Sequence, residues 1–271
     1  KAHLPPSQLG CILGGDLLNQ CIGTTFALRP TNVPFLGLYG ACSTMAEGLL
    51  VASCLVESGF EQTACAITSS HFCSAERQYR YPLEYGGQRP QTAQWTATAS
   101  GAVVLQKGGM GVRITHATPG RIADPGVTSQ ANMGAAMALS AYETISRFFQ
   151  DTHTGPSHYD LIVTGDLGKV GHQIVIDLFQ RDGIDMRPTY DDCGLLLYDG
   201  SQDVHAGGSG CGCSAAVLCS YILKAMEQGI FRKVLFCGTG ALLSPTSCNQ
   251  GQSIPGICHL ICLEADEKWN M

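Results

Sequence analysis

Short apolar runs alternate along the chain with longer segments in which apolar residues recur at helical spacing. The short runs predict buried strands, and the longer segments predict amphipathic helices. The predicted strands are Cys11–Gly14, Pro34–Leu38, Thr63–Thr68, Gly101–Gln106, Val112–Ala117, Leu161–Thr164, Lys233–Cys237 and Gly256–Glu264. The predicted helices are Asp16–Ala27, Ser43–Ser58, Ser129–Phe149, Gly171–Arg181 and Ser214–Gln228. This alternation predicts an α/β fold, with long loops over the polar, glycine-rich stretches 70–94 and 187–212.

The same order of elements occurs twice in the chain. The segment "CILGGDLLNQ" begins at Cys11 and resembles "LIVTGDLGKV", which begins at Leu161. The segments that begin at Gly48 and Ala216 each contain a long apolar helix, a Glu-x-Gly turn and a buried strand. This repetition predicts a duplicated α/β unit. In such a unit, the loops and helix starts at the strand ends form the natural pocket.

Composition narrows the possible partners. The 271 residues are 45% hydrophobic and 14% charged, with a net charge of -6. This balance argues against nucleic acid or an anionic membrane as the main partner. No apolar run is long enough to span a bilayer and no leader-like segment opens the chain, so we expect neither a transmembrane segment nor a signal peptide. The 14 cysteines lie mostly in apolar runs, which favours free thiols in a reducing compartment over disulfides or a metal site.

Cys42 lies in "GACST", between an apolar run and a predicted helix. The hydroxyls of Ser43 and Thr44 are expected to cap that helix. A thiol beside the positive end of a helix has a lowered pKa, which favours the reactive thiolate. Three interpretations remain open for Cys42: a nucleophile, part of a pocket wall, or ordinary core.

Two further segments carry candidate chemistry. In "GHQIV", His172 begins a predicted helix directly after a strand and could act as a base; a capping or surface histidine is the alternative. The glycine-rich segment "DVHAGGSGCGCS" contains His205 and Ser209. Glycines let a backbone approach a ligand closely, although a flexible loop has the same composition.

The segment "SSHFCSAERQYRYPLEYGGQRPQ" interleaves arginines with tyrosines. It holds His71, Arg77, Arg80 and Arg89. Guanidinium groups bind carboxylates with two parallel hydrogen bonds, and tyrosine rings suit flat ligands. The alternative is a surface loop in which Arg77 pairs with a neighbouring glutamate, either Glu76 or Glu84.

Several motifs resemble the thiolase superfamily in the correct order. "YGACSTMAEGL" is similar to the nucleophile segment of ketoacyl synthase III enzymes, and "GHQIV" to their His-Gln segment at His172 and Gln173. "TASGAVVLQ" and "VLFCGTGALLSP" resemble two further strands of that superfamily. The segment "CSAERQYRYPLEYGGQRPQTAQWTATASGAVVL" strongly resembles the stage V sporulation protein AD family of spore-forming bacteria.

The resemblance implies a thiolase-like fold of duplicated layers, an α/β/α/β/α sandwich. Its halves would be residues 1–118 and 119–271, which together form one compact unit. The first strand and helix of the N-terminal half are expected to be missing before "CILGGD". A homodimer paired through a sheet edge is also expected from this resemblance.

The family resemblance implies that the chain binds dipicolinic acid, alone or with calcium, and takes part in its movement into and out of the spore. The implied partners are the other membrane proteins of the stage V sporulation A operon, at the inner membrane of the forespore and spore. No cofactor and no resident metal are expected. The expected ligand-binding residues are Cys42, His172, Ser209, His71, Arg77, Arg80 and Lys169.

The alternative function is a thiolase or ketoacyl-synthase-type acyltransferase that uses Cys42 as nucleophile with His172. Condensing enzymes need a third group, an Asn or second His, near the glycine-rich loop. This chain has Ser209 in that region, and Cys237 is shifted by one residue from the second thiolase cysteine. These departures favour an inherited enzyme pocket that is reused for binding.

Asp16 and Asp166 occupy equivalent positions in the two repeats. Their carboxylates could supply oxygen ligands if calcium entered with the ligand. Helix N-capping is the simpler role and is the one we expect.

Overall fold

The computed structural model describes residues 4–80 and 87–266. Two mixed sheets form the framework. The first has the order β2-β1-β3-β5 and the second has the order β6-β11-β10-β7-β8. The strands are β1 (Cys11–Asp16), β2 (Phe35–Gly37), β3 (Thr63–Ser70), β5 (Ala99–Gln106), β6 (Val112–Thr118), β7 (Leu161–Thr164), β8 (Tyr190–Asp192), β10 (Lys233–Ala241) and β11 (Gly256–Ala265). A small third sheet pairs β4 (Trp95–Thr96) with β9 (Gly208–Ser209).

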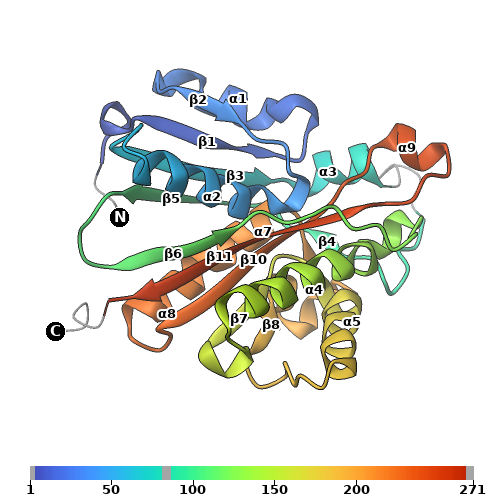
Figure 1. The fold of residues 1–271 in the computed structure, drawn as a ribbon. Helices are drawn as coiled ribbons and strands as arrows, with labels where there is room; N and C mark the ends of the chain where they lie inside the picture. The colour runs from blue at the N-terminus through green and yellow to red at the C-terminus, as the bar shows by residue number, and fades with distance from the viewer. Residues whose placement is uncertain (1–3, 81–86, 267–271) are drawn as a thin grey trace.

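The helices form layers around these two sheets (Figure 1). They are α1 (Ile22–Leu28), α2 (Thr44–Glu57), α3 (Phe72–Tyr79), α4 (Met133–Thr152), α5 (Gly168–Arg181), α6 (Cys193–Leu196), α7 (Cys211–Val217), α8 (Leu223–Glu227) and α9 (Pro245–Asn249). Helix α2 packs on β1 and β3 on one side and on β10 and β11 on the other. Helix α4 covers the outer face of the second sheet and packs on α5, while α1 contacts β1. This is the predicted α/β/α/β/α arrangement.

The strand order confirms the internal repeat. Strands β2, β1 and β3 run parallel and β5 is antiparallel to β3. Strands β8, β7 and β10 are likewise parallel, and β11 is antiparallel to β10. In the second sheet, β6 then pairs with the outer edge of β11. Among the described residues, no strand occupies the equivalent position beside β5.

The core lies on both faces of the second sheet. One cluster between the two sheets contains Leu49, Val163, Leu218, Phe236 and Ile261, all essentially without solvent exposure. A second cluster packs α4 and α5 on the outer face of that sheet. Burial of this apolar surface is the main driving force that holds the layers together.

Glycines in β10 set the position of the segment that carries Cys42. A Cβ on Gly238 would lie 2.6 Å from the Cβ of Ala46, and one on Gly240 would lie 2.7 Å from the carbonyl oxygen of Gly40. These distances are too short for any side chain larger than hydrogen. Strand β10 therefore contacts the start of α2 directly and places the end of "CGTGA" beside Cys42.

The structure corrects several predicted boundaries. Asp16 ends β1 instead of beginning a helix, and α1 begins only at Ile22. The predicted helix 214–228 begins at Cys211 and contains a π-turn at Leu218–Ile222. The two predicted loops contain α3 and the short elements β8, α6 and β9, because tertiary packing stabilises elements too short to show a clear period. Tyr81, Glu84 and Tyr85, from the tyrosine-rich segment, lie outside the described residues.

Candidate functional site

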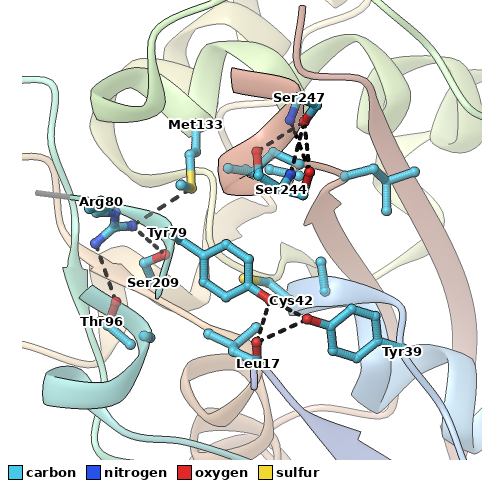
Figure 2. Close-up of a pocket in the computed structure, with 15 residues that line it drawn as sticks. Leu17, Tyr39, Cys42, Tyr79, Arg80, Thr96, Met133, Ser209, Ser244 and Ser247 are labelled. Atoms are coloured by element: carbon cyan, nitrogen blue, oxygen red, sulfur yellow. Dashed lines mark hydrogen bonds between the residues drawn. The ribbon is translucent and has the colours of Figure 1, made fainter. Parts of the chain in front are cut away.

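A cavity of about 350 Å³ opens where both repeats contribute loops and helix starts (Figure 2). Most of its walls are apolar, and polar groups reach it from several elements. It is lined by Leu17, Tyr39, Ala41, Cys42, Ala75, Tyr79, Arg80, Thr96, Met133, Ser209, Ala241, Leu242, Leu243, Ser244 and Ser247. Of the residues predicted to bind ligand, the structure brings together Cys42, Arg80 and Ser209 at this cavity.

Cys42 lies in a single 3-10 turn, Ala41–Ser43, just before α2. The backbone of Ala41 is left-handed, with φ of 52°, which makes a sharp turn directly before Cys42. The predicted capping is wrong: the hydroxyl of Ser43 donates to the carbonyl of Gly40 at 2.6 Å, and that of Thr44 donates to Ala41 at 2.7 Å. In this turn both hydroxyls lie near carbonyls three residues earlier, so neither can serve the free N–H groups of α2.

The predicted lowering of the Cys42 pKa is also wrong. Burial raises the pKa of this thiol well above its ordinary value, and the charge of Asp166 raises it further. A desolvated thiol beside a carboxylate resists ionisation, because the thiolate would be both unsolvated and repelled. Cys42 is therefore a protonated thiol at neutral pH.

Asp166 is the buried acid that contacts Cys42, and sequence reasoning did not place it there. Its carboxylate accepts hydrogen bonds from the backbone N–H of Gly210 at 2.8 Å and from the hydroxyl of Thr239 at 3.0 Å. The hydroxyl of Ser209 donates to it at 3.3 Å, and the thiol of Cys42 donates to it as well. The sequence signal that could have placed Asp166 at the site is its position just after β7, the strand that corresponds to β1 in the other repeat.

Asp16 bonds to the first turn of a helix as expected, but it does so from the end of β1 and not from the N-cap position. Asp166 does not cap a helix. Asp16 accepts from the N–H of Leu18 at 2.9 Å and of Thr24 at 2.6 Å, and so holds the turn that leads into α1. At the start of α5, Asp192 accepts from the N–H groups of Leu167 and Gly168 instead. The oxygens of Asp166 accept from the donors named above, and no cluster of three metal-binding side chains occurs in residues 4–80 and 87–266.

His172 does not line the cavity. Helix α5 begins at Gly168, so His172 lies one turn inside the helix, where its ring stacks on Tyr190 with centroids 4.6 Å apart. Burial lowers the pKa of this imidazole. Cys42 and His172 are thus not brought together, and the described cavity lining contains no histidine.

Arg80 follows α3 and is the cation of the cavity wall; its side chain is only 8% exposed. Its guanidinium forms an ion pair with Glu76 and donates to the carbonyl of Gln94 at 2.9 Å. It also donates to the hydroxyls of Thr96 and Ser209, each at 3.2 Å. These bonds hold the guanidinium in one orientation at the cavity.

Glu76 is shared between two guanidinium groups. One nitrogen of Arg89 lies 3.9 Å from its carboxylate, and the Arg89 guanidinium stacks over Trp95 at 4.7 Å. Of these two cations, Arg80 is the one in the described lining of the cavity. Glu76 thus pairs with Arg80, and the other expected partner of Arg77, Glu84, lies outside the described residues.

Tyrosine and serine hydroxyls supply the other polar groups of the cavity. The hydroxyl of Tyr79 bonds with that of Tyr39 and with the carbonyl of Leu17 (Figure 2). Burial raises the pKa of Tyr79, which therefore stays neutral and able to donate. Ser244 and Ser247, on the side of the second repeat, line the cavity at α9.

The remaining predicted residues lie elsewhere. His71 lines a separate polar cavity of about 400 Å³ together with Asp16. Arg77 and Lys169 are exposed and do not line the cavity of Cys42. Since exposure and side-chain direction depend on the folded backbone, the sequence pattern alone did not separate these cations from Arg80.

We expect Cys42 to be alkylated by iodoacetamide at pH 7.5 at least about 100-fold more slowly than the exposed Cys73, since only the thiolate reacts. Peptide mass spectrometry after timed labelling measures both rates in the same sample. Labelling in urea provides the control, because unfolding should make the two rates similar. Equal rates in the folded protein would contradict the assignment of Cys42 as a protonated, buried thiol.

Comparison with known proteins places the chain in a family. The family described as Stage V sporulation protein AD (SpoVAD) matches residues 1–264. Stage V sporulation protein AD of Bacillus subtilis (strain 168) is 47% identical over 264 residues, which cover 97% of this chain and 78% of that protein. Among the described residues, no helix is both long and apolar enough to cross a bilayer.

Solved structures with the same fold include a 3-oxoacyl-[acyl-carrier-protein] synthase III and OleA. The 3-oxoacyl-[acyl-carrier-protein] synthase III of Aquifex aeolicus VF5 gives a TM-score of 0.57 at 14% identity, over 97% of this chain and 79% of that one. OleA of Xanthomonas campestris, in a structure with bound lauric acid and lauroyl-CoA, gives 0.62 at 13% identity, over 97% and 78%. These likenesses confirm the predicted thiolase-like fold. The match over residues 1–264 and the 47% identity show more: the chain belongs to the stage V sporulation protein AD family.

Proposed function

We propose that this chain binds dipicolinic acid, pyridine-2,6-dicarboxylate, in the cavity beside Cys42 and takes part in its movement into and out of the spore. Membership of a sporulation family supports the biological setting. The observation that carries the proposal is the combination of apolar walls with one oriented guanidinium, that of Arg80. The cavity volume of about 350 Å³ lies in the range of small-ligand sites.

The charge distribution of the cavity suits an aromatic dicarboxylate. A buried anion without a cation or N–H partner is heavily penalised. Of this group Arg80 lines the cavity, and its guanidinium, which shares Glu76 with Arg89, can receive one carboxylate. The second carboxylate would take the hydrogen bonds that the hydroxyls of Tyr39 and Tyr79 now donate to the carbonyl of Leu17, while the apolar walls contact the ring.

The second candidate is an acyltransferase that uses Cys42 as nucleophile, as the fold neighbours suggest. Three features of the site disfavour it: a thiol of raised pKa, a carboxylate beside that thiol, and a described lining without histidine. A nucleophilic thiol needs an adjacent base or a lowered pKa. Incubation with acetyl-CoA followed by intact mass measurement separates the candidates, because only the acyltransferase gains an acyl group on Cys42.

Calorimetric titration with dipicolinate, in the presence and absence of calcium, tests the binding proposal. We expect saturable binding of one ligand per chain. Pyridine-2-carboxylate is the matched control, because it keeps the ring and loses one carboxylate; we expect it to bind at least about tenfold more weakly. No saturable heat with either form of dipicolinate would overturn the proposal.

We further propose that two copies of the chain pair through the outer edge of β2. This strand ends the first sheet (Figure 1), and its residue Leu36 is 49% exposed, while Phe26 in α1 is 61% exposed. An edge strand flanked by exposed apolar side chains is suited to pairing with a second copy. Light scattering should give a dimer for the wild type and a monomer for Leu36→Asp. A monomeric wild type, or a dimeric variant, would contradict this interface.

Family membership also supports the proposal that the chain lies at the surface of the inner spore membrane. There it would be bound to other membrane proteins of the stage V sporulation A operon. Under this proposal, the chain should co-purify with those proteins from detergent-solubilised spore membranes. Its recovery in the wash fraction of membranes that retain those proteins would contradict the proposal. The proposed function requires no cofactor.

A further inference from the structure

Asp166 lies directly behind the cavity wall. Two residues that line the cavity, Cys42 and Ser209, donate hydrogen bonds to its carboxylate. The side chain is completely buried, and among the described residues no salt bridge joins it to a cation. An anion that enters the cavity therefore places its charge next to a buried carboxylate, and the two repel each other in a region of low dielectric.

The hydroxyl of Ser209 connects this acid with the cavity. It accepts a hydrogen bond from Arg80 at 3.2 Å and donates its own proton to Asp166 at 3.3 Å. A serine hydroxyl has one proton and two acceptor positions. While Asp166 is ionised, Ser209 thus has no proton left to donate to a ligand in the cavity.

Protonation of Asp166 reverses the direction of the hydrogen bond between this acid and Ser209. A proton taken from solvent onto Oδ2 can be donated to the oxygen of Ser209, which then accepts from both Arg80 and Asp166. The hydroxyl proton of Ser209 is released to turn toward the cavity. No covalent bond other than the new O–H bond forms or breaks, and the negative charge beside the ligand is removed.

We propose that the cavity binds its dianionic ligand together with one proton, which is held by Asp166 and relayed to the ligand as a hydrogen bond from Ser209. This inference rests on the proposed function and adds a pH dependence to it. Burial raises the pKa of Asp166, which brings the acid closer to taking up this proton. Since the bound state holds more protons than the free state, affinity must rise as the pH falls.

Other titratable groups surround Asp166. Apart from Arg80, its neighbours are Cys42, Cys193, Cys211, Cys213 and Asp192. Burial raises the pKa of each of these thiols, so they remain neutral across the relevant range. Burial also raises the pKa of Asp192 to about 7, but this carboxylate bonds to the start of α5 and does not line the cavity. An acid away from this group, the exposed Asp185 that pairs with Arg187, therefore serves as the control for Asp166.

The test is calorimetric titration with dipicolinate between pH 6 and pH 9, in buffers of different ionisation enthalpy. Both ligand carboxyls are ionised in this range, because ordinary carboxyl pKa values lie near 4. We expect Kd to rise by up to about tenfold per pH unit and about one proton to be taken up on binding. Asp166→Asn should abolish the proton uptake and flatten the pH dependence, whereas Asp185→Asn should keep both.

The outcomes separate this inference from the proposed function. Binding with a constant Kd and no proton uptake would overturn the role of Asp166 and leave the binding site intact. Proton uptake that persists in Asp166→Asn would assign the proton to another group and would equally overturn the inference. Absence of binding at every pH would overturn the proposed function itself. If Asp166→Asn does not fold, Ser209→Ala provides the second variant: without the relayed hydrogen bond the pH dependence of Kd should become weaker than in the wild type, and an unchanged pH dependence would overturn the relay.

Discussion

Arg80→Gln is expected to weaken dipicolinate binding by at least about 100-fold, because hydrogen bonds between charged groups in a desolvated site contribute roughly 3 kcal/mol. The guanidinium is buried, oriented by four different neighbours and exposed to the cavity. Its loss removes the cation that offsets the first carboxylate and leaves Glu76 with the hydroxyl of Thr96 and the more distant Arg89. Calorimetric titration of both proteins at pH 7 measures the ratio of the two Kd values.

Arg147→Gln is the matched control for this variant. Arg147 is exposed on α4, where it pairs with Asp151 one turn away. An exposed pair of this kind contributes little to stability. We expect the control to bind dipicolinate with the wild-type Kd, and Arg80→Lys to retain part of the affinity through its charge. Wild-type affinity in a folded Arg80→Gln protein would place the ligand outside this cavity.

Asp192→Ala is expected to destabilise the protein by about 4 kcal/mol, since several buried donors lose their acceptor together. The carboxylate accepts from the N–H groups of Leu167, Gly168 and Gly194 and from the hydroxyl of Thr164. These bonds tie the end of β7 to the start of α5 and to α6. For a domain of this size we expect the melting temperature to fall by roughly 10 °C. Circular dichroism during thermal unfolding measures this shift.

Asp185→Ala provides the comparison for that experiment. Asp185 is an exposed acid that pairs with the neighbouring Arg187, and exposed substitutions usually change stability by less than about 0.5 kcal/mol. A similar melting temperature for the two variants would mean that the hydrogen bonds of Asp192 contribute little. That result would weaken the view that this carboxylate organises the loop behind the cavity.

Local sequence patterns were sufficient for the framework. The apolar run "LIVT" predicted β7 at its observed bounds, Leu161–Thr164, because a buried strand needs only a short apolar segment between turns. The internal repeat likewise predicted the matching order of strands in the two sheets. The junction at Cys42 and the basic segment around Arg80 were both found, since each carries an unusual local composition.

The chemistry of the site was less predictable because it depends on contacts between distant residues. Asp166 meets Gly210 and Thr239, which lie 44 and 73 positions away in the chain. Helix α5 begins three residues earlier than its apolar pattern indicates, because Gly168 adopts φ of 60° against the carbonyl of Ala206. That earlier start places His172 inside the helix and leaves Asp166 at the strand end beside Cys42.

The most direct test of the central claim is the crystal structure of the protein grown with dipicolinate. The account predicts ligand density in the cavity beside Cys42, with one carboxylate bonded to the guanidinium of Arg80 and no covalent bond to the thiol. Dipicolinate bound elsewhere on the chain, with this cavity lacking ligand density, would contradict the account.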